Sequence, residues 1–193
     1  MIKAFLFLIV SVLGLCFLSC KSENNKIIPS EKITVDENLS KNDTFKILSK
    51  YPELKLFNSE KVESATRTAY ILQISSFSDG YNHTRSVSFE DYKCKTEYKG
   101  DTINIWLNNY NGYFGNGVLV KIFNDQFLIQ DIDPKTLKGE IKFINSHPVY
   151  QKLVLNKYIF QKSDSIYGFI DYETKLDSLV TKNFRGYFKT KIK

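Results

Sequence analysis

The stretch YKCKTEYKGDTINIWL, residues 92–107, indicates the fold class more clearly than any other part of the chain. Its first half alternates neutral side chains with charged ones, which is the period-two pattern of a strand with one buried face and one wet face. Gly100 and Asp101 then favour a tight turn, after which Ile103, Ile105 and Leu107 resume the alternation. The stretch therefore predicts a β-hairpin.

The same alternation recurs along most of the chain from about residue 65 onward. Before the hairpin, Tyr70, Leu72 and Ile74 alternate and predict a strand with these three side chains on its buried face. A slip in phase between Phe89 and Tyr92 predicts a β-bulge. After the hairpin, apolar segments separated by turn residues predict strands at 118–122, 127–132, 141–143, 149–155, 166–172 and 184–192.

Short strands at near-regular spacing predict a mainly β fold. Because the connections have hairpin length, we expect an antiparallel meander that forms either a β-sandwich or an up-and-down barrel, with one or two short helical turns. One short helix is predicted to begin at Asn42 or Asp43, with Phe45, Ile47 and Leu48 on a shared face. The pattern has no strand–helix–strand alternation, which argues against nucleotide-binding α/β folds.

Composition limits the chemistry that the chain can perform. Of its 193 residues, 42% are hydrophobic and 25% are charged, which is typical of a globular protein and excludes disordered, collagen-like and multi-span membrane classes. Three cysteines and two histidines are too few for a disulfide framework or a multi-histidine metal site. His83 and His147 each stand apart from other metal-ligating residue types, so no metal and no cofactor are expected.

The familiar sequence motifs of catalysis do not occur. The chain has no G-x-S-x-G elbow, P-loop or G-x-G-x-x-G, and no catalytic residue is predicted. Cys94 is either a core side chain or a nucleophile, and the core is favoured because Lys93 and Lys95 point to the opposite strand face. Asp131 and Asp133 are either solvated residues at a strand end or part of a calcium site.

An apolar run near the N-terminus predicts an export signal. Lys3 is followed by the run 4–18, whose helix would measure about 22 Å, short of the roughly 30 Å that a spanning helix must cross. A secretory signal peptide over residues 1–19 is therefore favoured over a permanent transmembrane anchor. Residues 20–40 are polar and charged and predict a flexible linker, whereas residues 41–193 predict a single β-rich domain.

The end of the apolar run resembles the lipobox of bacterial lipoproteins. In Phe17-Leu18-Ser19-Cys20, the small residue Ser19 directly precedes the cysteine. The resemblance implies that Cys20 becomes the lipidated N-terminus, which carries acyl chains such as palmitate. The expected location is the bacterial cell envelope, with the protein anchored to the outer membrane on its periplasmic or surface face. The alternatives are an uncleaved anchor and simple secretion.

Two C-terminal segments carry a further resemblance. SDSIYG at 163–168 and FRGYFK at 184–189 are similar to the D-S-I-x-G and G-x-F ending of many uncharacterised lipoproteins of Bacteroidota-type bacteria. The resemblance covers the signal segment and roughly the last thirty residues. It implies a β-rich envelope lipoprotein and transfers no catalytic residue.

The segment WLNNYNGYFGNG, residues 106–117, is the most unusual part of the composition. Its asparagines and glycines suit a tight loop, while its flat rings and amide groups suit recognition of a sugar or a peptide. The candidate ligand-binding residues are Trp106, Tyr110, Tyr113, Phe114, Asn109 and Asn111. The alternative is that these rings fold back onto the core as a lid.

Basic residues gather on the last predicted strand. Arg185, Lys189, Lys191 and Lys193 share one face with Tyr187. This stripe can attract an anionic surface such as lipid headgroups or acidic glycans. The alternative is a solvated strand whose lysines prevent aggregation between sheet edges.

These patterns lead to a functional hypothesis. The chain is expected to be a membrane-tethered envelope lipoprotein that acts as a non-enzymatic binding or interaction module. Its expected partners are the membrane, through the N-terminal lipid, and an envelope protein, a glycan or a small ligand, but not nucleic acid. The alternatives are an envelope hydrolase with an unrecognised site and an immunity-type or assembly-type partner protein.

Overall fold

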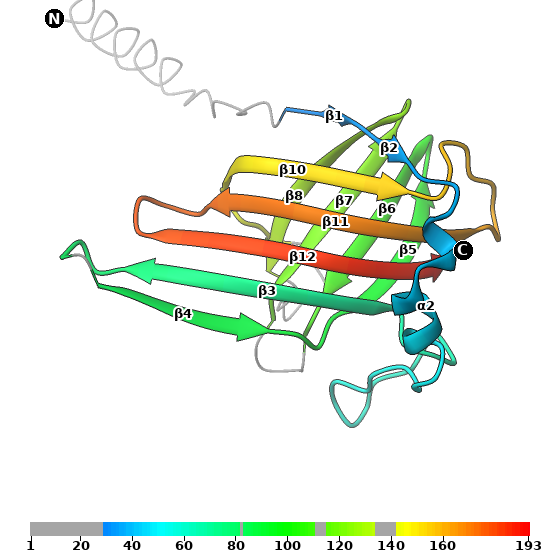
Figure 1. The fold of residues 1–193 in the computed structure, drawn as a ribbon, viewed down its shortest axis with the longest axis horizontal. Helices are drawn as coiled ribbons and strands as arrows, with labels where there is room; N and C mark the ends of the chain where they lie inside the picture. The colour runs from blue at the N-terminus through cyan, green and yellow to red at the C-terminus, as the bar shows by residue number, and fades with distance from the viewer. Residues whose placement is uncertain (1–28, 82, 111–114, 134–141) are drawn as a thin grey trace, which may run out of the picture.

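A computed structural model describes residues 29–81, 83–110, 115–133 and 142–193. Two six-stranded sheets pack face to face, and the one α-helix of the described residues lies on the outside of one sheet (Figure 1). The predicted mainly β fold is therefore confirmed, and the two separate sheets identify it as a β-sandwich.

The first sheet is built around the predicted hairpin. β5 (Lys93–Lys99) and β6 (Thr102–Asn108) pair antiparallel, with Cys94 opposite Leu107 and Tyr98 opposite Ile103. The meander continues with β7 (Gly117–Phe123) and β8 (Gln126–Asp133). The short strands β1 (Glu31–Lys32) and β9 (Lys142–Phe143) both pair with β8. The predicted hairpin is thus confirmed, with its turn at Gly100 and Asp101.

The second sheet joins strands from both ends of the chain in the order β2-β10-β11-β12-β3-β4. Its strands are β2 (Thr34–Val35), β10 (His147–Leu155), β11 (Ser165–Lys175), β12 (Val180–Lys191), β3 (Ala69–Ser78) and β4 (Thr84–Phe89). The pairing of β2 with β10 is parallel and the others are antiparallel.

The predicted β-bulge between Phe89 and Tyr92 is wrong. β4 ends at Phe89 in the second sheet, and β5 begins at Lys93 in the first sheet. The slip in phase therefore marks the point where the chain crosses between sheets. Such a crossing and a bulge leave the same trace in the sequence, because each shifts the alternation by a residue.

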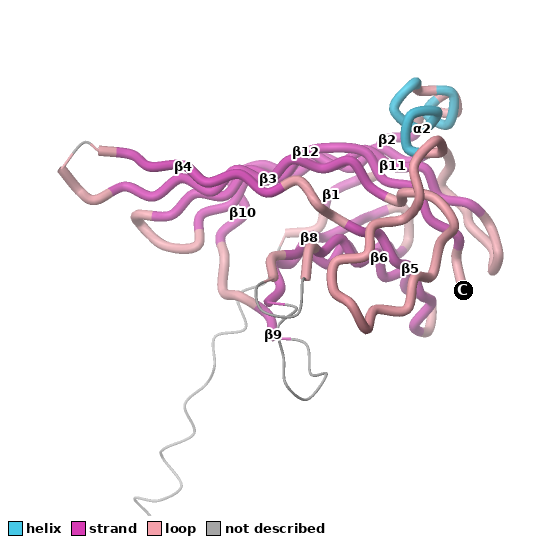
Figure 2. Tube along the Cα trace, turned by 90° about the horizontal axis from the view of Figure 1, so that it is seen from below, coloured by secondary structure: helices cyan, strands magenta, loops and turns pink. Residues whose placement is uncertain are grey.

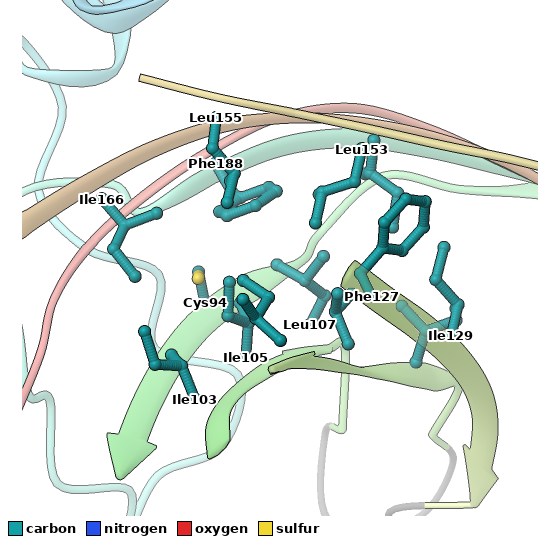
Figure 3. Close-up of a cluster of buried hydrophobic side chains, with 14 of the residues drawn as sticks. Cys94, Ile103, Ile105, Leu107, Phe127, Ile129, Leu153, Leu155, Ile166 and Phe188 are labelled. Atoms are coloured by element: carbon teal, nitrogen blue, oxygen red, sulfur yellow. The ribbon is translucent and has the colours of Figure 1, made fainter. Parts of the chain in front are cut away.

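The core lies between the sheets and is filled by alternate residues of the long strands (Figure 3). Figure 3 shows Ile105, Leu107 and Phe127 of the first sheet facing Leu153 and Phe188 of the second. All five side chains are almost fully buried.

One core position demands glycine. A Cβ on Gly168 would lie 2.1 Å from a ring carbon of Phe188, which is its cross-strand partner. The ring of Phe188 therefore occupies the space that any other side chain at position 168 would need.

The prediction that Tyr70, Leu72 and Ile74 lie on the buried face of β3 is wrong. Tyr70, Leu72 and Ile74 are 62%, 39% and 36% exposed and lie on the outer face of the second sheet. The inward positions include Gln73, whose amide oxygen accepts a hydrogen bond from the buried Tyr92 hydroxyl. Because the core here contains polar groups, the more apolar face of β3 is the outer one.

The predicted short helix is confirmed, but one of its contacts is not. α2 (Asp43–Leu48) begins after Asn42, whose side chain accepts a hydrogen bond from the Thr44 amide at 2.9 Å. Phe45 packs edge-on against the rings of Tyr167 and Tyr187 on the outer face of the second sheet. Ile47, predicted on the same buried face, is 52% exposed.

The chain just before α2 belongs to the folded body. β1 pairs with β8 and β2 pairs with β10, so this segment touches an edge strand of each sheet. Ile33 between them is buried, as is Leu39 in the 3-10 turn η1 (Leu39–Lys41). The sequence pattern predicts a linker up to residue 40, because the aliphatic residues of this segment are few and widely spaced.

The predicted signal peptide and Cys20 lie outside the described residues. Within the described ranges, none of the helices has the length and apolar character that crossing a membrane requires.

Candidate functional site

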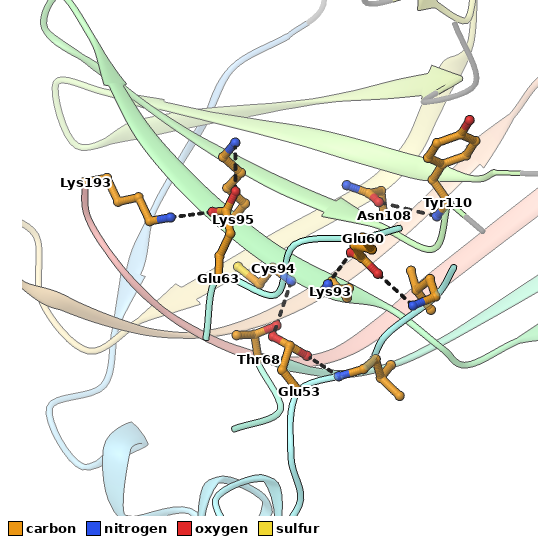
Figure 4. A network of polar contacts seen from close by, with 12 residues as sticks. Glu53, Glu60, Glu63, Thr68, Lys93, Cys94, Lys95, Asn108, Tyr110 and Lys193 are labelled. Carbon is orange, nitrogen blue, oxygen red and sulfur yellow. Dashed lines mark hydrogen bonds and ion pairs between the residues drawn. The ribbon is translucent and has the colours of Figure 1, made fainter. Parts of the chain in front are cut away.

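A pocket of about 310 Å³ opens where the 49–68 loop, which joins α2 to β3, lies over one side of the sandwich (Figure 4). β5 of the first sheet and β12 of the second supply its other walls. The charged residues that line it are Lys61, Lys93, Lys95, Lys189, Lys191, Lys193, Glu53, Glu60 and Glu63.

A chain of hydrogen bonds joins Glu53, Thr68 and Cys94 in the lining of the pocket. The Glu53 carboxylate is 8% exposed and accepts from the Thr68 hydroxyl at 2.5 Å and from the Leu54 amide at 2.9 Å. The Thr68 oxygen in turn accepts from the Cys94 amide at 3.0 Å. This chain fixes the loop to β5 and holds a carboxylate in a largely buried position.

Cys94 behaves as a core residue. Its side chain is buried, and burial together with the negative charge of Glu53 raises the pKa of its thiol well above the ordinary value. A thiol that stays protonated is a poor nucleophile. The geometry therefore supports the packing interpretation of Cys94.

Ion pairs fasten the loop along the rim of the pocket. Glu60 contacts Lys93, and these two side chains are only 15% exposed. Glu63 is more open: it lies 3.4 Å from Lys95 and also pairs with Lys193 near the C-terminus. The hydrogen bond from Lys193 is the main cause that lowers the pKa of the Glu63 carboxyl.

The pocket keeps an excess of positive charge. Its six lysines face three glutamates, and Lys61 and Lys191 have no carboxylate partner within the described ranges. Lys189 donates instead to the Ser49 hydroxyl at 2.6 Å, and partial burial lowers the pKa of its ammonium group. A small anion in this pocket would find ammonium groups that the protein has not neutralised.

The predicted basic stripe is divided by the structure. Lys189, Lys191 and Lys193 line the pocket. Arg185 lies farther along β12, where it is 3.8 Å from Asp171 and stacks near the ring of Phe169. The stripe is therefore not one uniform surface.

The predicted aromatic site is also divided. Trp106 lies half-buried on the outer face of the first sheet, where its ring nitrogen donates to Glu97 at 3.4 Å. Tyr110 packs against Phe57 of the 49–68 loop, with ring centroids 5.8 Å apart. Asn109 accepts a hydrogen bond from the Asn116 amide at 2.6 Å.

The other three candidates, Asn111, Tyr113 and Phe114, lie outside the described residues. Asn108 of the same segment lines the pocket, and its side chain accepts a hydrogen bond from the Tyr110 amide at 3.4 Å. The structure thus brings Tyr110 close to the wall of the pocket.

The acidic half of the pocket was not predicted. Glu53, Glu60 and Glu63 belong to a loop without apolar periodicity, so no pattern placed them relative to the sheets. The sequence predicts part of the lysine half, because Lys93 and Lys95 stand at alternate positions on the predicted solvent-facing side of β5.

The interpretation of Asp131 as a solvated residue at a strand end is wrong. Its side chain is fully buried, accepts from the Tyr172 hydroxyl at 2.7 Å and lies 2.5 Å from the Lys182 ammonium group. Among the described residues, no cluster of three or more histidine, cysteine or acidic side chains is arranged to hold a metal ion.

In comparisons with known proteins, no model of a protein family, no curated protein and no solved structure matches this chain.

Proposed function

We propose that this chain is a lipoprotein of the bacterial envelope, tethered through Cys20, that acts as a non-enzymatic binding module. Its ligand is a small molecule or glycan unit that carries a carboxylate or phosphate group. The observation that carries the proposal is the excess of lysine in the pocket under the 49–68 loop.

The size and lining of the pocket support a small ligand. A volume of about 310 Å³ lies at the lower end of the range of roughly 300–1,000 Å³ for small-molecule sites. Lys61 and Lys191 supply charge, while Ser64 and Thr190 add hydroxyl groups to the lining. Ammonium groups with neighbouring hydroxyl groups suit the oxygens of an acidic sugar or a phosphate.

The position of the pocket supports presentation away from the anchor. The chain joins the first sheet at β1, beside β8, whereas the pocket is walled by β5 at the other end of that sheet. Three strand spacings of about 4.8 Å separate β8 from β5, or roughly 14 Å. The nine residues that follow Cys20, up to Pro29, can extend about 30 Å at most.

The ligand class is tested by titration with glucuronate and with inorganic phosphate, followed by NMR of the backbone amides, with glucose as the neutral control. We expect shifts at pocket residues and about tenfold weaker binding in Lys191→Gln, because one charge-assisted contact is lost. Arg185→Gln removes the same charge from the same strand outside the pocket and should bind like the wild type. Equal weakening in both variants would refute a specific pocket.

The anchor is tested separately by metabolic labelling with an alkyne analogue of palmitate in a bacterial host. The wild-type chain should incorporate the label, and Cys20→Ala should not. Labelling that persists in Cys20→Ala would contradict lipidation at this residue without bearing on the pocket.

A further inference from the structure

The outer edge of β4 is open. β4 (Thr84–Phe89) is the last strand of the second sheet and pairs only with β3. Its first five residues are exposed and only Phe89 is half-buried. Figure 2 shows the β3–β4 hairpin extending beyond the first sheet.

The other long strands near the sheet edges are partly covered within the described residues. β8 is flanked by β1 and β9, and β10 pairs with β2 at Val154 and Leu155. The 49–68 loop is fastened to β5 through Glu60 and Glu63. Unlike β8 and β10, β4 has no strand of the described residues paired with any part of its outer edge.

Of the usual features that prevent pairing of edges, β4 has only one charged residue. Proteins protect such edges with proline, bulges or inward-pointing charges. β4 has no proline, Arg85 is its only charged residue, and its register with β3 runs without interruption from Gln73 opposite Phe89 to Ser78 opposite Thr84. A regular edge of this kind is a template for a further strand.

We propose that β4 pairs antiparallel with β4 of a second copy of this chain, which joins the two second sheets across a two-fold axis. In the register centred on Val87, this residue faces its own equivalent. Arg85 then lies opposite Phe89 of the second copy, and Thr84 lies opposite Glu90. Residues directly opposite each other in an antiparallel pair share a face of the sheet, so the two side chains of each of these pairs would lie next to each other on one face.

Self-association is favoured over an unrelated strand because the β4 sequence complements itself. The central position, Val87, is apolar and 47% exposed in the single chain, and it shares a face with Phe77, which is 44% exposed. The register also keeps the two arginines apart and places each guanidinium beside an aromatic ring, a favourable arrangement. Both features follow from β4 and its hairpin, independently of the pocket.

The test is sedimentation velocity on the full-length chain in mild detergent. The wild type should sediment as a dimer, whereas Val87→Lys and Val87→Glu should each be monomers, because each substitution places like charges directly opposite one another. An equimolar mixture of the two variants should restore the dimer, since lysine then faces glutamate.

Two controls separate this interface from other causes of association. Tyr81→Lys adds the same charge at an exposed turn position of the hairpin and should remain dimeric. Circular dichroism should show the same thermal transition for Val87→Lys and Tyr81→Lys. A monomeric wild type, a dimeric Val87→Lys, or a mixture that stays monomeric would overturn the proposal.

Discussion

The pair of Lys182 and Asp131 and the pair of Lys95 and Glu63 have the same chemistry but opposite surroundings. In the first pair the side chains are 3% and 0% exposed, and the atoms are 2.5 Å apart between the sheets. In the second they are 52% and 42% exposed, and the atoms are 3.4 Å apart at the pocket rim. The comparison separates ion pairs that hold the fold from ion pairs that a ligand can exchange.

Burial decides this difference because water competes for charges. A buried ion that loses its partner has no alternative solvation, so breaking such a pair costs several kcal/mol. An exposed pair already competes with water and contributes little, typically below about 1 kcal/mol. The exposed Lys95–Glu63 pair can therefore open at small cost, whereas the interior pair cannot.

The largest effect is expected when the interior pair is broken. Lys182→Met leaves the Asp131 carboxylate buried with only the Tyr172 hydroxyl as its described side-chain partner. We expect the free energy of unfolding to fall by about 3–5 kcal/mol, measured by urea denaturation. The double variant Lys182→Met/Asp131→Leu removes both charges and should recover most of the loss. A double variant no more stable than the single one would show that the loss came from packing.

A smaller effect is expected at the hydroxyl that supports the same carboxylate. Tyr172 is buried, and burial together with the negative charge of Asp131 raises the pKa of its hydroxyl, which therefore remains a donor. Tyr172→Phe removes this hydrogen bond to a charged acceptor and should cost about 1.5–3 kcal/mol in the same urea measurement. The loss should largely disappear when Asp131 is also replaced by leucine, and an additive result would contradict the contact.

The smallest effect is expected at the rim. The pKa of Glu63 is lowered from its ordinary value of 4.5, so its stabilising contribution is present above that pH and is lost as the pH falls through the lowered value. Glu63→Gln should therefore cost less than about 1 kcal/mol at pH 7, and the difference from the wild type should shrink as the pH is lowered below 4.5. A difference that does not change with pH would show that the carboxylate charge is not its source.

Local alternation was sufficient to predict the mainly β class and the β5–β6 hairpin, because the residues involved are neighbours in sequence, but it did not distinguish a β-sandwich from a barrel. The prediction failed at β3, because the inward-facing Gln73 accepts a hydrogen bond from the Tyr92 hydroxyl. It also failed at Asp131, whose partner Lys182 lies on the other sheet. These pairings depend on contacts between distant strands, which one sequence does not reveal. The pocket was half predictable for the same reason: Lys93, Lys95, Lys189 and Lys191 lie on strands, whereas the three glutamates lie on a loop.

The attachment of the N-terminal segment has a mechanical consequence. A pull on the chain before Pro29 acts first on the two residue pairs that join β1 to β8, and then on the two that join β2 to β10. Strands peeled from an edge yield one hydrogen bond at a time, so these ladders should release at low force. The long ladders of β10, β11, β12 and β3 carry no load until then. On the proposed tether, the segment would therefore lengthen under tension while the long ladders of the second sheet stay paired.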